Sequence, residues 1–256
     1  MISFKEVFSK KAFIGFITAG DPNIEATKRY INKMIEAGVS LIEIGIPFSD
    51  PIAEGEVITK ADIRALASGT TTDKIFEMMS DIRKTHPDFP FVFMTYLNPV
   101  FSYGYDNFFK KAQEVGMLGI IIPDMPIEEK NEASEIAKKY NQEVISLIAP
   151  TSENRIKKIA EKSNGFIYLV SSLGVTGVRS EFKTDLKSIV SEIKKYTDTP
   201  VAIGFGISNP EAVKNMCKIA DGAIVGSAIV RLVEEYGDKA DDYIFDFCKK
   251  MVEATK

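Results

Sequence analysis

Short apolar segments alternate with amphipathic segments along the chain. Eight of the apolar segments are rich in Ile, Val and Phe, which is typical of strands buried on both faces of a sheet. They occupy residues 13–18, 40–45, 91–96, 119–123, 143–148, 165–170, 201–206 and 221–226. The pattern therefore predicts eight buried strands. In the segments between them, apolar residues recur with a different spacing.

The segments between these strands repeat apolar residues at helical spacing. Within residues 23–38, Ile24, Ile31 and Met34 fall on one helix face, and Gly38 is placed to end the helix. The same pattern recurs at residues 71–84, 105–116, 127–140, 152–163, 185–196 and 209–220. The amphipathic segments are therefore predicted to be helices that cover the strands.

Eight strand–helix units in 256 residues average 32 residues each, the usual size of such a unit in a (β/α)₈ barrel. We predict one (β/α)₈ TIM-barrel domain over residues 1–256, with a short N-terminal helix. The alternative is a doubly wound open sheet, which would normally carry a glycine-rich fingerprint after its first strand. The sequence there is TAGDPN, which favours the barrel and directs attention to the carboxyl ends of the strands.

Composition narrows the class of protein. Hydrophobic residues make up 45% and charged residues 27% of the chain, as in soluble globular proteins rather than disordered ones. A net charge of -4 argues against nucleic acid as a partner, and no apolar run approaches the roughly 18 residues of a membrane span. The two cysteines lie in helix-like segments and no export signal is visible, so we expect a cytoplasmic protein. A single histidine argues against a metal site.

One carboxylate interrupts an apolar strand. Strand side chains alternate faces, so Glu43 points away from the face that carries Ile42 and Ile44. If the isoleucines meet the helices, Glu43 faces the barrel interior, where burial would raise its pKa and suit it to general acid catalysis. The alternative is a structural glutamate satisfied by backbone donors or an ion pair.

An acidic loop follows the same strand. Residues 46–56 contain Asp50, Glu54 and Glu56, and the loop is long enough for Glu54 to fold back over Glu43. Two carboxyl groups in different environments can divide acid and base work. The spacing is equally compatible with a solvated acidic loop.

Glycines cluster after the last two strands. Gly204 and Gly206 end one strand, with Ser208 expected to cap the next helix, and Gly226 and Ser227 begin another helix. Backbone N–H groups at such positions form the common phosphate site of barrels. The alternative is that these glycines only make tight turns.

The segment after the sixth strand, residues 171–185, is long and aperiodic, which is typical of a lid. Thr176 and Gly177 are its expected contact points, and an ordinary surface loop is the alternative. No predicted strand contains lysine for a Schiff base, and neither a histidine cluster nor a P-loop occurs. These features favour carboxylate chemistry on a phosphorylated small molecule without a cofactor.

Motifs along nearly the whole chain resemble the tryptophan synthase α subunit family. They are FITAGDP (16–22), IEIGIPFSDPIAEG (42–55), MTYLNPVFSYG (94–104), IIIPDMPIEE (120–129), LIAPTS (147–152), YLVSSLGVTG (168–177), GFGIS (204–208) and GSAIV (226–230). The resemblance implies a lyase that cleaves indole-3-glycerol phosphate to indole and glyceraldehyde 3-phosphate in tryptophan biosynthesis. It also implies an α₂β₂ complex in which the β subunit, not this chain, carries pyridoxal phosphate.

The resemblance assigns roles residue by residue. Glu43 and Glu54 match the catalytic carboxylates. The residues that match the substrate pocket are Phe16, Tyr96, Tyr168 and Phe205, with Thr176 in the lid. Those that match the phosphate cradle are Gly177, Gly206, Gly226 and Ser227. Those that match positions facing the β subunit are Asp50, Pro51 and Asn98.

Two motifs depart from the family pattern. The second carboxylate is usually Asp in a motif resembling ADGP, whereas this chain has AEGE, with Glu54 in that place and Glu56 where Pro is usual. The lid reads SSLGVTG rather than SRAGVTG. We expect Glu56 to act as a like charge beside Glu54 and raise a pKa there, which puts the rate in question more than the reaction.

A mechanism follows from these residues. Glu43 would protonate C3 of the indole and then, as carboxylate, take the proton of the glycerol hydroxyl while the C–C bond breaks. Glu54 would stabilise the cation at the indole nitrogen. Two other functions stay open: a free-standing indole-releasing lyase, and a weakly catalytic partner that mainly activates the β subunit.

Overall fold

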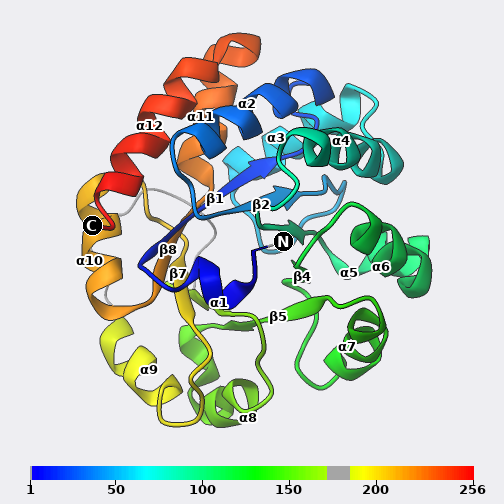
Figure 1. The fold of residues 1–256 in the computed structure, drawn as a ribbon. Coiled ribbons are helices and arrows are strands. Elements are labelled where there is room, and N and C mark those ends of the chain that lie inside the picture. The colour runs from blue at the N-terminus through cyan, green and yellow to red at the C-terminus, as the bar shows by residue number, and fades with distance from the viewer. Residues whose placement is uncertain (1, 172–184) are drawn as a thin grey trace.

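A computed structural model describes residues 2–171 and 185–256. Within these two stretches, eight parallel strands close into a barrel in chain order (Figure 1). They are β1 (Ala12–Thr18), β2 (Leu41–Gly45), β3 (Phe91–Met94), β4 (Gly119–Ile121), β5 (Glu143–Ile148), β6 (Ile167–Val170), β7 (Val201–Gly204) and β8 (Gly222–Val225). Because β1 pairs with both β2 and β8, the predicted barrel is confirmed and the open sheet is excluded.

Helices form a ring outside the strands (Figure 1). They are α2 (Ile24–Glu36), α3 (Glu56–Ala67), α4 (Thr72–Thr85), α5 (Leu97–Tyr103), α6 (Tyr105–Glu114), α7 (Lys130–Lys139), α8 (Ile156–Ala160), α9 (Leu186–Ile193), α10 (Pro210–Ile219), α11 (Ser227–Tyr236) and α12 (Asp241–Glu253), with 3₁₀ turns η1 (Pro150–Arg155) and η2 (Gly237–Lys239). The predicted helices did not include α3, α5 and α12. Helix α5 was not predicted because its proline, Pro99, is typical of a loop. Pro99 lies in the first turn of the helix, where proline is tolerated.

Helix α1 (Phe4–Val7) lies across one end of the barrel (Figure 1). The Phe4 and Phe8 rings pack on Phe166, with centroids 5.9 and 5.6 Å apart. Phe166 directly precedes β6, so this is the amino-terminal end of the strands. The amino-terminal end is thus closed by aromatic packing, and the opposite end is left for a site.

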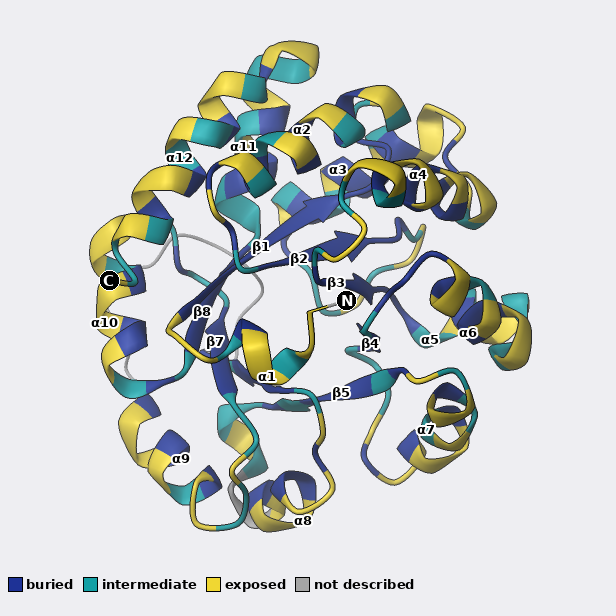
Figure 2. Cartoon of the chain, in the orientation of Figure 1, coloured by how far each residue is buried: buried dark blue, intermediate teal, exposed yellow. Residues whose placement is uncertain are grey.

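Two apolar cores follow from the alternation of strand side chains. Ile42, Ile44 and Ile46 pack between β2 and the helices, whereas Leu41 packs inside the barrel. Figure 2 shows the result: the strands are buried except for half-buried residues in β5 and β6, and the helices are buried toward the strands and exposed outward. The predicted orientation of β2 is therefore confirmed, with Glu43 on the interior face.

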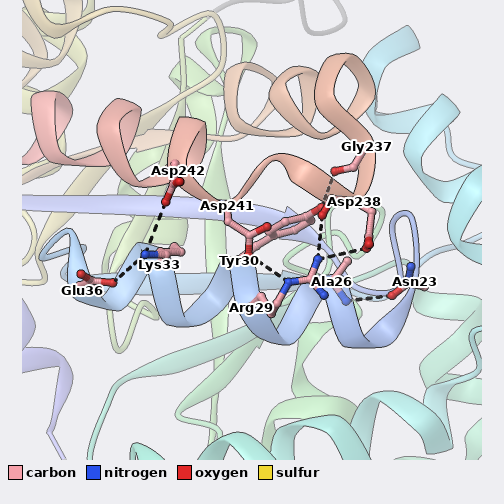
Figure 3. A network of polar contacts seen from close by, with 10 residues as sticks. All are labelled: Asn23, Ala26, Arg29, Tyr30, Lys33, Glu36, Gly237, Asp238, Asp241 and Asp242. Atoms are coloured by element: carbon pink, nitrogen blue, oxygen red, sulfur yellow. Dashed lines mark hydrogen bonds and ion pairs between the residues drawn. The ribbon is translucent and has the colours of Figure 1, made fainter.

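The last helix is tied to the first helix of the ring (Figure 3). Arg29 of α2 donates hydrogen bonds to Asp238 and Asp241 at 3.1 Å, and the Tyr30 hydroxyl donates to the Gly237 carbonyl at 2.5 Å. Exposed ion pairs contribute little each. These contacts mark where α12 packs along α2 and beside β1, so that the last helix completes the ring.

Candidate active site

A cavity opens at the carboxyl ends of the strands. Including its mouth it encloses about 660 Å³, within the size range of small-molecule sites. Its walls are formed by Phe16, Glu43, Glu54, Ile58, Met94, Tyr168, Phe205, Gly206, Ile207, Ser208, Ile224, Gly226, Ser227, Ala228 and Arg231. The structure thus brings both predicted carboxylates together with most of the predicted pocket and phosphate residues.

Glu43 is the buried acid of this cavity. It pairs in register with Phe16 of β1 and Val92 of β3, so its side chain lies near the centre of the barrel floor. The side chain is fully buried, and neither carboxyl oxygen has a hydrogen-bond partner within residues 2–171 and 185–256. Burial raises the pKa of Glu43 to about 8. The alternative of a structurally satisfied glutamate is therefore contradicted for the described part of the chain.

Two inward-facing glycines make room for the aromatic walls. A Cβ on Gly45 would lie 2.6 Å from the Phe16 ring, and one on Gly204 would lie 2.3 Å from the Tyr168 hydroxyl. Each ring therefore occupies the space that a side chain on the neighbouring strand would take. The Tyr168 and Phe205 rings meet edge to face at 6.0 Å. The walls beside Glu43 are flat and apolar, which suits a planar aromatic group.

Glu54 lies in the loop between β2 and α3 and faces the same cavity. The Tyr96 hydroxyl accepts a hydrogen bond from the Ala53 N–H at 2.9 Å and also contacts the Glu54 carboxylate. Burial raises the pKa of Glu54 to about 7. One oxygen, Oε2, is buried without a hydrogen-bond partner among the residues that the structure describes. Glu54 is thus not a solvated loop residue, and Tyr96 supports it from behind rather than lining the cavity.

The expected role of Glu56 as the like charge beside Glu54 is wrong. The Glu56 carboxylate is exposed and forms an ion pair with Lys60 at 2.6 Å, a contact that lowers its pKa. The carboxyl group in contact with Glu54 is Asp62 of α3. Helix α3 begins at Glu56, so this side chain points along the helix toward Lys60, one turn later.

The opposite wall of the cavity is built from loop glycines and a helix start. Gly206 follows β7, and α11 begins at Ser227 with Gly226 as its N-cap, so free N–H groups of the first turn face the cavity wall. The expected cap of α10, Ser208, is wrong: Asn209 caps it, accepting from the Ala212 N–H at 2.8 Å. Pro210 at the first helical position sets this register, and it leaves Ser208 on the cavity wall.

Sequence reasoning missed one cation at this wall. Arg231 follows Ser227 by four residues, one turn of α11, and lines the cavity beside it. The signal was available, because residues at i and i+4 of a helix share a face. A guanidinium beside a helix N-terminus adds a positive charge where an anion would bind.

Asp50, Pro51 and Asn98 are not among the residues that line the cavity. Asp50 and Asn98 are exposed on the connections after β2 and β3, and Pro51 is half-buried. Ile52 and Phe101, on the same two connections, are 76% and 66% exposed. Thr176 and Gly177 lie outside the residues that the structure describes, so their predicted roles stay predictions.

The closed barrel and the cavity at its carboxyl-terminal face define a (β/α)₈-barrel enzyme. The family model described as Tryptophan synthase alpha chain matches residues 4–255. This chain therefore belongs to the tryptophan synthase alpha chain family.

Individual relatives agree with this assignment. The alpha chain of Lacticaseibacillus casei is 47% identical over 252 residues, which cover 98% of this chain and 94% of that one. The alpha chain of Methanocaldococcus jannaschii is 45% identical over 239 residues, 92% and 85% of the two chains. A solved structure of Mycobacterium tuberculosis tryptophan synthase matches with a TM-score of 0.90 and 30% identity, over 100% and 99% of the two chains. A Pyrococcus furiosus tryptophan synthase complex matches with a TM-score of 0.86 and 33% identity, over 94% and 98%.

Proposed function

We propose that the cavity carries out the alpha reaction with Glu43 as acid and base and Glu54 as the second carboxylate. As a tryptophan synthase alpha chain, the protein is a lyase of tryptophan biosynthesis that cleaves indole-3-glycerol phosphate to indole and glyceraldehyde 3-phosphate. The observation that carries the assignment of Glu43 is its complete burial in the cavity with both oxygens unpaired in the described structure. Such a group has no structural partner and is available to a ligand.

The protonation state of Glu43 suits the first step. With its pKa raised to about 8 by burial, the carboxyl group carries a proton at neutral pH and can donate it to C3 of the indole ring. The ring then bears a positive charge at nitrogen. The resulting carboxylate accepts the proton of the glycerol hydroxyl next to the ring, the C–C bond breaks, and its electron pair returns to the ring. Indole leaves with a hydrogen at C3 and the hydroxyl carbon becomes the aldehyde.

Glu54 and the aromatic walls act on the indole. The Glu54 carboxylate, which lines the cavity, is an acceptor for the indole N–H and stabilises the cation that forms there. Phe16, Tyr168 and Phe205 supply apolar surface for the ring, and Tyr96 orients Glu54. The charge of Glu54 is needed in the transition state, so this carboxyl group must be ionised while Glu43 is protonated.

The phosphate of the substrate fits the opposite wall. N–H groups of the α11 start at Gly226 and Ser227, together with Gly206, suit an anion, and Arg231 adds a cation there. In this orientation the phosphate supplies binding energy remote from the reacting bond and fixes the glycerol chain against Glu43. No cofactor takes part in these steps, because the indole ring itself is the electron sink.

We place the β subunit of tryptophan synthase on the exposed connections after β2 and β3, in an α₂β₂ complex whose β subunit carries pyridoxal phosphate. A second Pyrococcus furiosus structure that this chain matches is of the tryptophan synthase a2b2 complex and concerns mutual activation in that complex. Asp50, Pro51 and Asn98 lie on this face, and the exposed Ile52 and Phe101 supply apolar area. A cytoplasmic location is supported by the two free, buried cysteines.

Indole release by the isolated chain, with and without β subunit, tests this proposal. We expect turnover by the chain alone and a higher kcat on adding β, because docking orders the loop that carries Glu54. Phe101→Glu should weaken the activation without changing the unstimulated rate. Ile63→Glu is the matched control, since Ile63 is 61% exposed on α3. Equal activation of wild type and Phe101→Glu would move the β-subunit face elsewhere, and absence of indole release would contradict the assignment of the reaction.

A further inference from the structure

A third buried carboxyl group lies next to the active site. Asp62 of α3 is 5% exposed and stands one helical turn after Ile58, a residue of the cavity wall, so both side chains occupy the inner face of the helix. No role in the reaction described above requires a carboxyl group at this place. Burying a carboxyl group is costly unless its contacts compensate, and those contacts indicate what it does.

Asp62 joins the two ends of the loop that carries the second carboxylate. Its carboxyl group interacts with the backbone of Phe48 at the start of the loop. It also contacts the carboxyl group of Glu54 at the end of the loop. Glu54 also contacts Tyr96. The Glu54 carboxyl group therefore has two side-chain neighbours, Asp62 and Tyr96, that can fix its position.

Two carboxyl groups in buried contact do not both ionise, because the second negative charge would be placed against the first in a medium of low polarity. Within the described residues, the other charged and titratable groups around the pair are Tyr96, Asp21, Arg64 and Glu234. The one cation among them, Arg64, is engaged by Asp21 in two hydrogen bonds of 2.8 Å. It does not neutralise the pair.

We propose that Asp62 is a positioning residue for Glu54: it keeps the proton that the pair shares, donates it in a hydrogen bond to the Glu54 carboxylate, and so holds Glu54 ionised at the cavity. This inference rests on the role proposed for Glu54. Asp62 is buried, whereas Glu54 is half-buried and lines the cavity, so Asp62 is the member of the pair that is expected to stay neutral. Burial and the neighbouring charge raise the pKa of Asp62, which agrees with this assignment.

The shared proton can be observed without turnover. Infrared difference spectra at pH 8 report protonated carboxyl groups by their C=O stretching band, and a Glu43→Gln background removes the contribution of Glu43. Asp21, which is also buried, is paired with Arg64. In that background we expect one band that disappears on adding Asp62→Asn, which preserves the shape. It should persist on adding Glu56→Gln, the exposed control. A spectrum unchanged by Asp62→Asn would overturn the proposal, whatever the role of Glu54 in catalysis.

Kinetics test the positioning role. Asp62→Leu removes the donor, so the Glu54 carboxylate loses a stabilising hydrogen bond and its ionisation moves to higher pH. We expect kcat to fall by about 10-fold to 10²-fold through misplacement of Glu54, with its acidic limb moved to higher pH and KM changed little. Asp62→Asn, whose amide retains a hydrogen-bond donor, should have a higher kcat than Asp62→Leu, and the acidic limb of its pH profile should lie closer to that of the wild type. A wild-type rate and pH profile in Asp62→Leu would refute the positioning role, whereas a wild-type rate in Glu54→Ala would refute the proposed function instead.

Discussion

Replacing Glu43 by Gln should change stability in a pH-dependent way that reveals its protonation state. The substitution keeps the shape of the side chain but removes the ionisable proton. In the unfolded chain Glu43 loses its proton near pH 4.5, whereas in the folded chain it keeps the proton up to about pH 8. Between these values the native state binds more protons than the unfolded state, so the stability of the wild type falls as pH rises.

The size of the effect follows from the same two values. They lie about 3.5 pH units apart, from 4.5 to about 8, and each unit corresponds to about 1.4 kcal/mol. The pH-dependent part of the cost of burying Glu43 is therefore on the order of 5 kcal/mol at pH 8 and vanishes below pH 4.5. Glutamine does not titrate, so the stability of Glu43→Gln relative to wild type should increase by about 1.4 kcal/mol per pH unit across this interval.

Urea unfolding at pH 5, 6, 7 and 8 measures this difference directly. Glu77→Gln, at an exposed position of α4, supplies the baseline for the same chemical change. A wild-type-minus-variant difference that stays constant with pH would show that Glu43 is ionised in the folded protein, and the argument for a general acid would fail with it.

The same substitution should abolish cleavage. Loss of a general acid and base typically costs about 10²-fold to 10⁴-fold in rate, so Glu43→Gln with more than a tenth of the wild-type kcat would contradict its role. In the wild type, kcat/KM should decline above about pH 8, where the acid loses its proton. The decline in kcat/KM and the pH dependence of the unfolding free energy should give the same pKa, because both report the ionisation of Glu43.

Five further substitutions, at four positions, test the rest of the cavity. Glu54→Ala should lose most activity with and without β subunit, whereas Glu54→Asp should remain active; wild-type cleavage by the alanine variant would remove Glu54 from the mechanism. Ser227→Asp should raise KM, since two anions would meet at one helix N-terminus, and inorganic phosphate should compete with substrate in the wild type. If both effects were absent, the phosphate would have to bind elsewhere. Arg231→Ala should raise KM with little change in kcat, and an unchanged KM would exclude contact with the phosphate. Gly204→Ala places a Cβ 2.3 Å from the Tyr168 hydroxyl, so the free energy of unfolding in urea should fall by about 1–3 kcal/mol. An unchanged urea midpoint would mean that the Tyr168 ring can move aside without cost.

The sequence by itself determined the barrel and the inward direction of Glu43. Both depend on local periods: alternation along a strand has a period of two, and a run such as residues 40–45 therefore assigns each side chain to a face before the fold is known. The glycines followed by a helix start after β7 and β8 are likewise local features, and the structure places them at the cavity; that they bind phosphate is still a prediction. The lid residues Thr176 and Gly177 remain sequence predictions.

Only the tertiary structure decided which groups meet at the second carboxylate. Glu54 and Glu56 are neighbours in sequence, but α3 begins between them, so Glu56 turns outward to Lys60 while Glu54 turns inward. Asp62, two helical turns later, reaches Glu54 because α3 packs over the mouth of the barrel. Burial and mutual charge, not residue type, set the proton affinity of such a pair, and both depend on contacts made when the chain folds back on itself. No local period encodes those contacts.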